Sequence, residues 1–255
     1  MRTNRVKENL QAGQPSFGVG TLWPSPEVVE FCGYHGFDWL WLDLEHGAFD
    51  LHNLAHVVRA ADATGMVSIG RLPHTRDPEV VLRYMETGLG GIIVSHVHGK
   101  EDIEFAVQAS KYPPVGIRSA GVMRPANWGI GWPSAEYYAW SNENTVVMAL
   151  VEDREGIENL DEILSVPGLD AVVIGYGDLS LTTGHPGDRY HPEVAELGRI
   201  GTQKVLNSKV ALQVTVQDGD GARKAVEEGA LMVRCSIPSV LGAAMQSWLD
   251  KAKGE

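Results

Sequence analysis

The chain has 255 residues, a formal net charge of −12 at pH 7 and 44% hydrophobic residues. The acidic balance argues against a nucleic-acid partner, because DNA and RNA select basic faces. No apolar run reaches the roughly 20 residues of a membrane span. Only two cysteines are present, Cys32 and Cys235, far apart in sequence. We therefore expect a reduced, cytoplasmic compartment.

Apolar runs alternate with amphipathic stretches from end to end. Near-continuous apolar strands indicate a parallel sheet buried on both faces, and eight such units indicate a closed barrel. We therefore predict one α/β domain, a (β/α)8 TIM barrel over residues 1–255. The predicted strands are residues 16–22, 39–43, 67–71, 91–95, 145–151, 171–174, 210–213 and 231–235. The predicted helices include residues 51–64, 78–87, 101–110, 156–165, 192–207, 219–228 and 239–252.

One segment, residues 112–144, is too long for a simple connection between a helix and a strand. It is rich in proline, glycine and tryptophan. Long ordered excursions in barrels often shape a site or a subunit contact. A surface insertion with no further role is the alternative.

Two predicted strands lead into carboxylates. Glu152 follows the strand at 145–151, and Asp178 follows the strand at 171–174 by a few residues. The carboxyl ends of parallel strands share one face of a barrel, where catalytic groups gather. Two carboxylates there can bind a hard cation such as Mg²⁺ or Mn²⁺ and leave positions open for substrate. The alternatives are an ion pair with an arginine, or a helix cap in the case of Asp178.

Other polar residues follow the second and third predicted strands. Asp43 and Glu45 share a face if the chain stays extended, and His46 comes next. Asp43 is placed to fix the imidazole tautomer so that His46 acts as a base. Arg71 can hold a carboxylate or stabilise an enolate oxygen. A capping histidine and an ion-paired arginine are the alternatives.

The remaining histidines and the lysines carry less weight. His96 and His98 form a His-x-His pair without a third ligand at a usual spacing, and His52 and His56 are expected to be a surface pair on a helix. The predicted strands contain no lysine. A Schiff-base mechanism requires one, so carbonyl chemistry here would use a metal ion as the electron sink.

These residues resemble the HpcH/HpaI aldolase family, the metal-dependent pyruvate aldolases, over nearly the whole chain. The matching segments lie in family order. They are residues 10–13, 17–18, 36–40 with Glu45 and His46, 112–118, Glu152 with 154–155, 174–175 with 178–180, and 191–194.

The resemblance implies roles by position. Glu152 and Asp178 correspond to the metal ligands, for Mg²⁺, Mn²⁺ or Co²⁺. His46 corresponds to the catalytic base with Asp43 as its partner, and Arg71 to the group that stabilises the transition state. Glu86 falls where the family often has an aspartate that acts across a subunit contact. Gly177 and Asp178 fall where backbone amides hold the pyruvate carboxylate.

Three positions depart from the family pattern. Leu150 stands where many members have a substrate-binding glutamine, and Gly20 where many have a tryptophan. Tyr176 and Gly177 replace the usual Pro-x pair before the aspartate. Together with Val214, we take Leu150 and Tyr176 as the residues that shape an altered substrate shell.

The sequence therefore predicts a carbon–carbon lyase that cleaves a 4-hydroxy-2-oxo acid, reversibly, to pyruvate or a related 2-oxo acid and an aldehyde. An acyl-CoA lyase of the citrate or malyl-CoA type is one alternative, although no basic patch for the CoA phosphates is evident. A non-catalytic barrel that binds a 2-oxo acid or a partner protein is another.

The last predicted helix carries a broad apolar face with Val240, Leu241, Met245, Trp248 and Leu249. Such a face must be covered by something. The family resemblance implies that a neighbouring subunit covers it by exchange of this helix, giving a homo-oligomer built from trimers, most often a hexamer.

Overall fold

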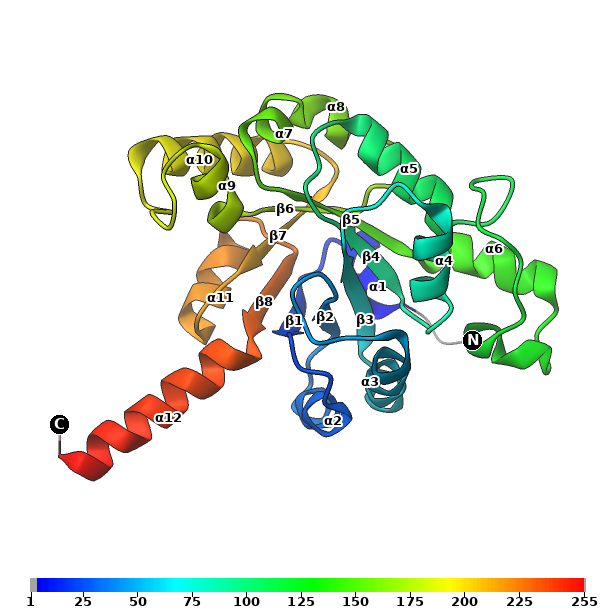
Figure 1. The fold of residues 1–255 in the computed structure, drawn as a ribbon, viewed down its shortest axis with the longest axis horizontal. Coiled ribbons are helices and arrows are strands. Elements are labelled where there is room, and N and C mark those ends of the chain that lie inside the picture. Colours follow the sequence, from blue (N-terminus) through cyan, green and yellow to red (C-terminus); the bar gives the residue numbers. More distant parts are fainter. Residues whose placement is uncertain (1–3, 255) are drawn as a thin grey trace.

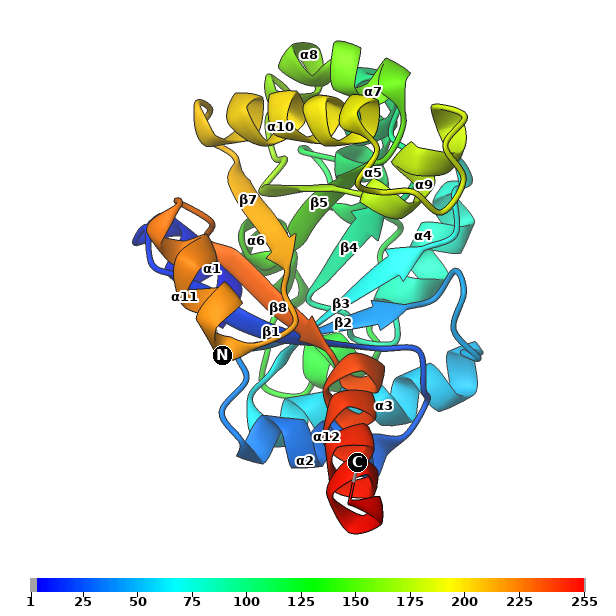
Figure 2. The ribbon, with the colours of Figure 1, turned by 90° about the vertical axis from the view of Figure 1, so that its left-hand side faces the viewer.

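A computed structural model describes residues 4–254. Eight parallel strands close into a barrel in sequence order, and helices surround it (Figures 1 and 2). The strands are β1 (Ser16–Thr21), β2 (Trp39–Asp43), β3 (Val67–Leu72), β4 (Gly91–Val94), β5 (Val146–Val151), β6 (Ala171–Ile174), β7 (Ala211–Thr215) and β8 (Met232–Ser236). The predicted (β/α)8 barrel is confirmed.

Helix α1 precedes β1, and the other helices lie in the connections between strands or after β8. They are α1 (Arg5–Gln11), α2 (Pro26–Tyr34), α3 (Leu51–Thr64), α4 (Pro78–Met85), α5 (Lys100–Ser110), η1 (Arg124–Gly129), α6 (Ser134–Asn144), α7 (Arg154–Glu158), α8 (Leu160–Leu164), α9 (Tyr176–Thr182), α10 (Pro192–Leu206), α11 (Gly219–Glu227) and α12 (Ile237–Lys253). None of the helices within residues 4–254 has the length and apolar character of a membrane span.

The barrel has two hydrophobic layers because side chains alternate along each strand. Inward-facing residues such as Trp39, Ile69 and Met148 fill the barrel interior. Outward-facing residues such as Leu40 and Val172 pack under the helices. Gly18 of β1 also faces inward, where an added Cβ would lie 2.2 Å from the Trp39 indole. Only glycine therefore leaves room for Trp39 inside the barrel.

The helix ends show how the sequence sets the boundaries. Asp50 caps α3 with a capping box, in which Asn53 returns a side-chain contact to the Asp50 backbone. Gly65 ends the helix in the left-handed region, with φ at +83°, as expected for a glycine cap. The α3 bounds agree with the predicted helix 51–64.

Some elements differ from the prediction. The predicted helix 156–165 is divided into α7 and α8 at Asn159, because the φ and ψ angles of Asn159 lie outside the α-helical region. Strand β7 extends to Thr215, two residues beyond the predicted end. A short helix, α9, directly follows β6, so Asp178 lies in its first turn.

The long segment at residues 112–144 covers the amino-terminal end of the barrel. It contains η1 and α6 and an aromatic cluster that includes Tyr112, Trp132 and Tyr137. With Arg118 and Arg124, this segment lines a hollow of about 820 Å³ that also touches the start of β3. The hollow therefore lies at the end opposite Glu152, which follows the carboxyl end of β5.

Helix α12 leaves the barrel after β8 and projects away from it (Figures 1 and 2). Only Ile237, at its first position, is buried, while Met245 and Trp248 are 61% and 70% exposed. The apolar face predicted from the sequence is thus uncovered in the single chain.

Candidate active site

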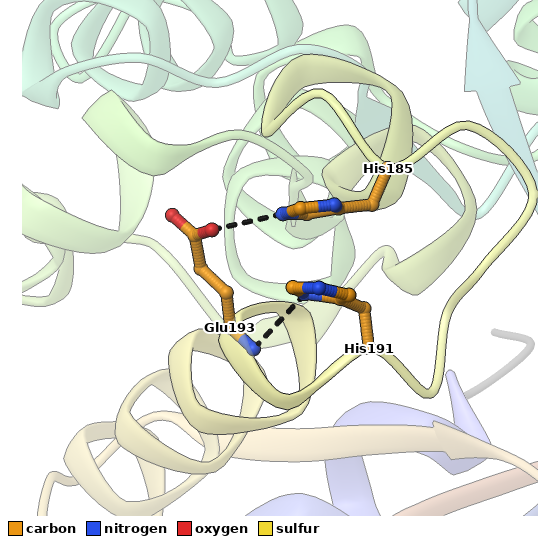
Figure 3. A group of neighbouring side chains, drawn as sticks. All are labelled: His185, His191 and Glu193. Atoms are coloured by element: carbon orange, nitrogen blue, oxygen red, sulfur yellow. Dashed lines mark hydrogen bonds and ion pairs between the residues drawn. The ribbon is translucent and has the colours of Figure 1, made fainter.

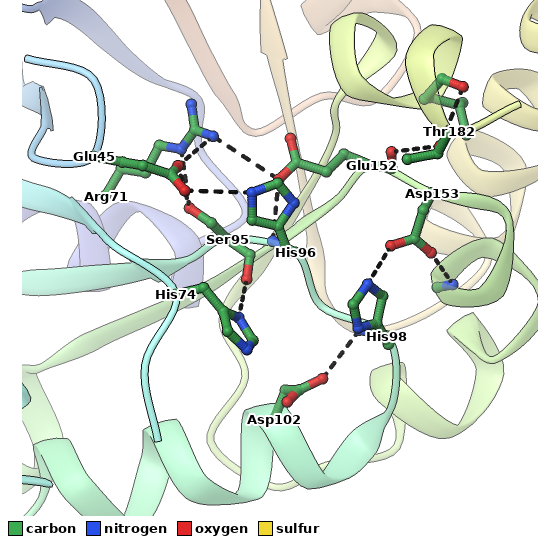
Figure 4. Close-up of polar contacts among 12 residues, drawn as sticks. Glu45, Arg71, His74, Ser95, His96, His98, Asp102, Glu152, Asp153 and Thr182 are labelled. Carbon is green, nitrogen blue, oxygen red and sulfur yellow. Dashed lines mark hydrogen bonds and ion pairs between the residues drawn. The ribbon is translucent and has the colours of Figure 1, made fainter. Parts of the chain in front are cut away.

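The centre of the site is the carboxylate of Glu152, which directly follows β5 and is 2% exposed. Its Oε1 accepts a hydrogen bond from the backbone N–H of His96 at 3.0 Å, and the His96 Nδ1 lies 3.2 Å away. The Nη2 of Arg71 lies 3.9 Å from the same oxygen. Figure 4 shows these groups converging from β3, β4 and β5.

Arg71 is held in place by its other contacts. It is 8% exposed, and its Nε donates a hydrogen bond to the Ser95 Oγ at 3.0 Å. Its Nη2 forms an ion pair with Glu45 at 2.5 Å, and its Nη1 lies 3.6 Å from Asp43. Such a fixed, always charged fork can stabilise an anion without reorganising.

Glu45, which follows β2, contacts side chains at the carboxyl ends of β3 and β4 (Figure 4). Besides the Arg71 ion pair, it accepts a hydrogen bond from the Ser95 hydroxyl at 3.0 Å, and its Oε1 lies 3.3 Å from the His96 Nε2. Sequence reasoning gave no role to Glu45 beyond sharing a face with Asp43, and none to Ser95. The signal for Ser95 was its place at the end of the fourth predicted strand.

His46 lies at the rim with its side chain 60% exposed, and its Nε2 is 3.8 Å from Glu45. Asp43 does not contact the imidazole in the way we expected. The Oδ1 of Asp43 instead accepts hydrogen bonds from the backbone N–H groups of Glu45 and His46, at 3.2 and 3.0 Å. A short aspartate that ends a strand readily bonds the turn that follows it, so Asp43 shapes the loop that carries His46.

The two histidines of the His-x-His pair, His96 and His98, contact different carboxylates. The His96 backbone is left-handed, with φ at +52°, and its ring lies between Glu45 and Glu152. The ring of His98 contacts Asp153 at 2.7 Å, outside this cluster. The pair therefore does not hold a common ligand, and His96 enters the site as a residue that the sequence left unassigned.

The Glu152 carboxyl has an abnormal acidity. Burial raises the pKa of Glu152 to about 8, and the neighbouring Asp178 also acts to raise this pKa. Arg71 and the His96 backbone N–H lower it, but they do not compensate for burial. Two adjacent carboxyl groups with too little positive charge around them form a set of oxygen donors that suits a hard divalent cation.

The residues predicted to shape the substrate shell occupy different places. Leu150 is buried and faces the barrel interior, in register with Val173. Tyr176 begins α9, and its ring packs on Gly198 of α10, away from the barrel interior. Gly177 follows at the exposed start of the same helix, with no heavy atom near an added Cβ.

The structure places Val214 in the outer layer, where it packs under the helices. Its register partner Val233 also faces outward. The prediction of Val214 as a pocket residue was off by one position, because side chains alternate and β7 presents Gln213 and Thr215 inward. The Gln213 amide is 1% exposed, and neither its nitrogen nor its oxygen has a hydrogen-bond partner within residues 4–254.

Glu86 lies at the end of α4, on the amino-terminal side of the barrel. Its Oε1 accepts a hydrogen bond from Arg118 at 2.9 Å. It has no contact with His46 of the same chain among the described residues. Its role across a subunit contact stays a prediction.

A second polar cluster lies between α9 and α10 (Figure 3). The rings of His185 and His191 stack with centroids 3.4 Å apart, and the His185 Nε2 lies 2.8 Å from the Glu193 carboxylate. One ligand atom from each of the three lies within 4.8 Å of the others. However, His191 caps α10 by accepting the Glu193 N–H, and Glu193 also pairs with Arg154. The cluster fastens the start of α10, and a metal ion would have to break these contacts.

Comparisons with known proteins agree on one group. The family model for HpcH/HpaI aldolase/citrate lyase matches residues 22–241. The 5-keto-4-deoxy-D-glucarate aldolase of Escherichia coli K12 is 31% identical over 254 residues, which cover 98% of this chain and 97% of that protein.

Two solved structures show the same likeness. An HpcH/HpaI aldolase/citrate lyase family protein from Burkholderia cenocepacia superposes with a TM-score of 0.90 at 27% identity, covering 98% of this chain and 100% of that one. An HpcH/HpaI aldolase from Desulfitobacterium hafniense superposes with a TM-score of 0.87 at 28% identity, covering 97% of this chain and 96% of that one.

The raised pKa of the buried Glu152 carboxyl predicts that the stability of the metal-free protein depends on pH. Because its folded pKa is raised from 4.5 to about 8, its contribution to stability is present below pH 4.5 and is lost as the pH rises through 8. In the presence of a chelator, we expect the Tm of the native protein to fall between pH 5 and pH 9 more than that of Glu152→Gln.

Glu104→Gln, at an exposed position of α5, is the control and should follow the native curve. Parallel curves for the native protein and Glu152→Gln would show that Glu152 ionises at an ordinary pH.

Proposed function

The chain belongs to the HpcH/HpaI aldolase/citrate lyase family and is a carbon–carbon lyase, and we propose that it cleaves a 4-hydroxy-2-oxo acid reversibly to pyruvate, or a related 2-oxo acid, and an aldehyde. The observation that carries the proposal is the buried Glu152 carboxylate beside Asp178, with Arg71 facing it and His46 at the same rim. In this proposal, Glu152 and Asp178 hold the cation, Arg71 supplies a fixed positive charge and His46 supplies the base.

We propose Glu152 and Asp178 as the residues that hold the metal. Their fit rests on the donor chemistry, since two carboxyl groups lie together with a raised pKa at Glu152 and incomplete neutralisation by Arg71. When bound, a divalent ion such as Mg²⁺, Mn²⁺ or Co²⁺ supplies positive charge that orients a 2-oxo acid and stabilises its enolate. The family is metal-dependent, and the choice among these ions is part of the proposal.

The chain's own residues then account for the proton and electron movements. His46 removes the proton of the 4-hydroxyl group, which general-base catalysis accelerates by roughly 10²–10⁴-fold. The C3–C4 bond breaks, C4 becomes the aldehyde carbonyl, and the electron pair passes to C3 and the ketone oxygen as an enolate. The proton that His46 has taken up is then returned to C3, which gives pyruvate and restores the neutral imidazole.

Arg71 is proposed to face the enolate oxygen. Its guanidinium is already fixed by Ser95, Glu45 and Asp43 before substrate arrives, so little reorganisation is needed as negative charge develops. Gly177 and Asp178 are proposed, from the family resemblance, to hold the substrate carboxylate through their backbone amides.

A metal-dependent mechanism can be separated from a Schiff-base mechanism directly. The strands β1–β8 contain no lysine, so no amine lies on the barrel wall. We expect a chelator to abolish pyruvate release from a 4-hydroxy-2-oxo acid and Mg²⁺, Mn²⁺ or Co²⁺ to restore it. Treatment with borohydride and pyruvate should leave no adduct in the mass spectrum, and a trapped lysine adduct would contradict the mechanism.

The same assay tests His46. We expect His46→Ala to lower turnover by orders of magnitude with metal affinity nearly unchanged, because the imidazole does not contact Glu152 or Asp178 in any described interaction. His52→Ala, on the exposed face of α3, is the matched control and should be fully active. Full activity of His46→Ala would assign the base to another group.

We propose a trimer-based homo-oligomer, most often a hexamer, in which α12 packs on a neighbouring subunit and Glu86 acts across a subunit contact. Support comes from the exposed apolar side chains of α12, among them Met245 and Trp248. An uncovered face of this kind is costly in water.

Sedimentation tests the assembly. The native protein should sediment as the oligomer at micromolar concentration, and Met245→Glu should dissociate it, because a charge would enter the covered apolar face. Ala243→Glu introduces the same charge on the other side of α12 and should leave the oligomer intact. A native monomer would contradict the proposal.

A further inference from the structure

The hollow of about 820 Å³ at the amino-terminal end of the barrel takes no part in the proposed reaction. Its lining includes Ser68 of β3, Gly90 just before β4 and Thr145 just before β5. Arg71 and Glu152 lie at the opposite, carboxyl ends of β3 and β5. Figure 1 shows α6, which also borders the hollow, across the barrel from α12. A molecule bound in the hollow would therefore meet neither the proposed metal site nor α12.

Aromatic side chains form one wall of the hollow. Trp132 and Tyr137 are buried, and their ring centroids lie 5.1 Å apart in an edge-to-face arrangement. The Trp140 ring lies 5.1 Å from that of Trp132. Trp128 also lines the hollow and is 61% exposed, so solvent reaches its side chain. Because indole and phenol rings pack on other rings in offset or edge-to-face contact, this wall suits a planar aromatic ligand.

The backbone that carries Trp128 has an uncommon conformation. Asn127 and Trp128 are both left-handed, with φ at +51° and +57°, a region that bulky residues seldom adopt. The turn is held by hydrogen bonds from the Trp128 N–H to the Met123 carbonyl at 3.1 Å and from the Ile130 N–H to the Asn127 carbonyl at 3.0 Å. Backbone of this kind is concentrated at ligand-binding sites, and here it belongs to two residues that line the hollow.

Four residues in the lining carry a buried hydrogen-bond donor that has no partner within residues 4–254. These donors are the Ser68 hydroxyl, the Trp132 indole N–H and the Nε–H groups of Arg118 and Arg124. No carboxylate or amide oxygen of the lining is in the same condition among the described residues. A buried donor without an acceptor is costly. A ligand that brings acceptor oxygens to these residues would remove part of that cost.

Arginines give the hollow a positive character in a chain whose net charge is −12. Arg5, Arg118 and Arg124 line it, and Asp62 is the one acidic lining residue among residues 4–254. The acids that pair with Arg5 and Arg118 lie outside the lining, whereas Arg124 pairs with Asp62 at 2.7 Å. These pairs hold the guanidinium groups in place and use only some of the five N–H donors on each. The remaining donors favour a carboxylate or phosphate, which guanidinium groups bind by charge-assisted hydrogen bonds.

We propose that the hollow is a second binding site, separate from Glu152, for a planar aromatic anion: a ring that carries a carboxylate or a phosphate. The ring packs on the wall that includes Trp128 and Trp132, and the anionic group accepts hydrogen bonds from Arg118 and Arg124. The volume of the hollow lies within the range of small-molecule sites, roughly 300–1,000 Å³. This inference goes beyond the proposed cleavage, which takes place at the other end of the barrel, and it does not depend on that cleavage.

Calorimetric titration of the Mg²⁺-loaded protein tests the inference with two probes, 2-naphthoate and AMP. Each is compared with an uncharged counterpart, 2-naphthylmethanol or adenosine. At least one anion should bind about tenfold or more tightly than its counterpart, which cannot form charge-assisted hydrogen bonds. The anion that binds identifies the preferred group as a carboxylate or a phosphate. Its affinity should be the same with excess pyruvate and without it, because pyruvate occupies the other end of the barrel.

Substitutions on two sides of the hollow locate the probe. Arg124→Gln removes a guanidinium, and Trp128→Ala removes an exposed ring. Each should weaken binding of the anion about fivefold or more. Arg199→Gln is the matched control for the first, since Arg199 pairs with Glu196 on the surface of α10. Tyr34→Ala, at a position of α2 that is 79% exposed, is the control for the second, and both controls should keep the native affinity.

Several results would overturn the inference. They are no binding of either anion, equal binding of the anions and their uncharged counterparts, and displacement of the bound anion by pyruvate. Native affinity in both Arg124→Gln and Trp128→Ala would also overturn it, because the probe would then lie elsewhere. Circular dichroism shows whether each variant is folded, and either folded variant is sufficient to decide the location.

Discussion

The burial of the Glu152 carboxylate is the constraint on which the site depends. A carboxylate that is 2% exposed is unstable as an anion unless charge and hydrogen bonds surround it. Two neighbouring segments provide these, with Arg71 on β3 and the His96 backbone N–H after β4. Their compensation is incomplete, so the pKa of Glu152 is raised. That deficit of positive charge is the reason for expecting a cation, and it also explains why Arg71 must be fixed so firmly.

Much of the site could be predicted because strand order determines which residues meet. In a closed parallel barrel, residues at the carboxyl ends of the strands share one rim whatever their separation in sequence. Apolar runs located those ends to within one or two residues for most strands, and so Asp43, Arg71, Glu152 and Asp178 were placed on the same face. The bounds of α3 were also predictable, because Asp50 and Gly65 mark them.

The rest of the site could not be predicted, because it depends on side-chain contacts that the spacing of residues along the sequence does not reveal. Val214 was assigned to the pocket although the strand directs Gln213 inward, since an error of one residue reverses the face of a strand. Asp43 was expected against the imidazole of His46, but a nearby backbone turn offered its carboxylate closer partners. His96 and Glu45 were passed over because their contact is made across β2 and β4. Gly20 was recognised as unusual, but the pairing of β1 with β8 was needed to show that an added Cβ there would meet the guanidinium of Arg234 on β8.

The central claim is that Glu152 and Asp178 hold the divalent ion, and anomalous diffraction tests it most directly. Crystals grown with Mn²⁺ and pyruvate should show the strongest anomalous peak between these two carboxylates, close to Arg71. A peak at His185, His191 and Glu193 with none at Glu152 would contradict the account.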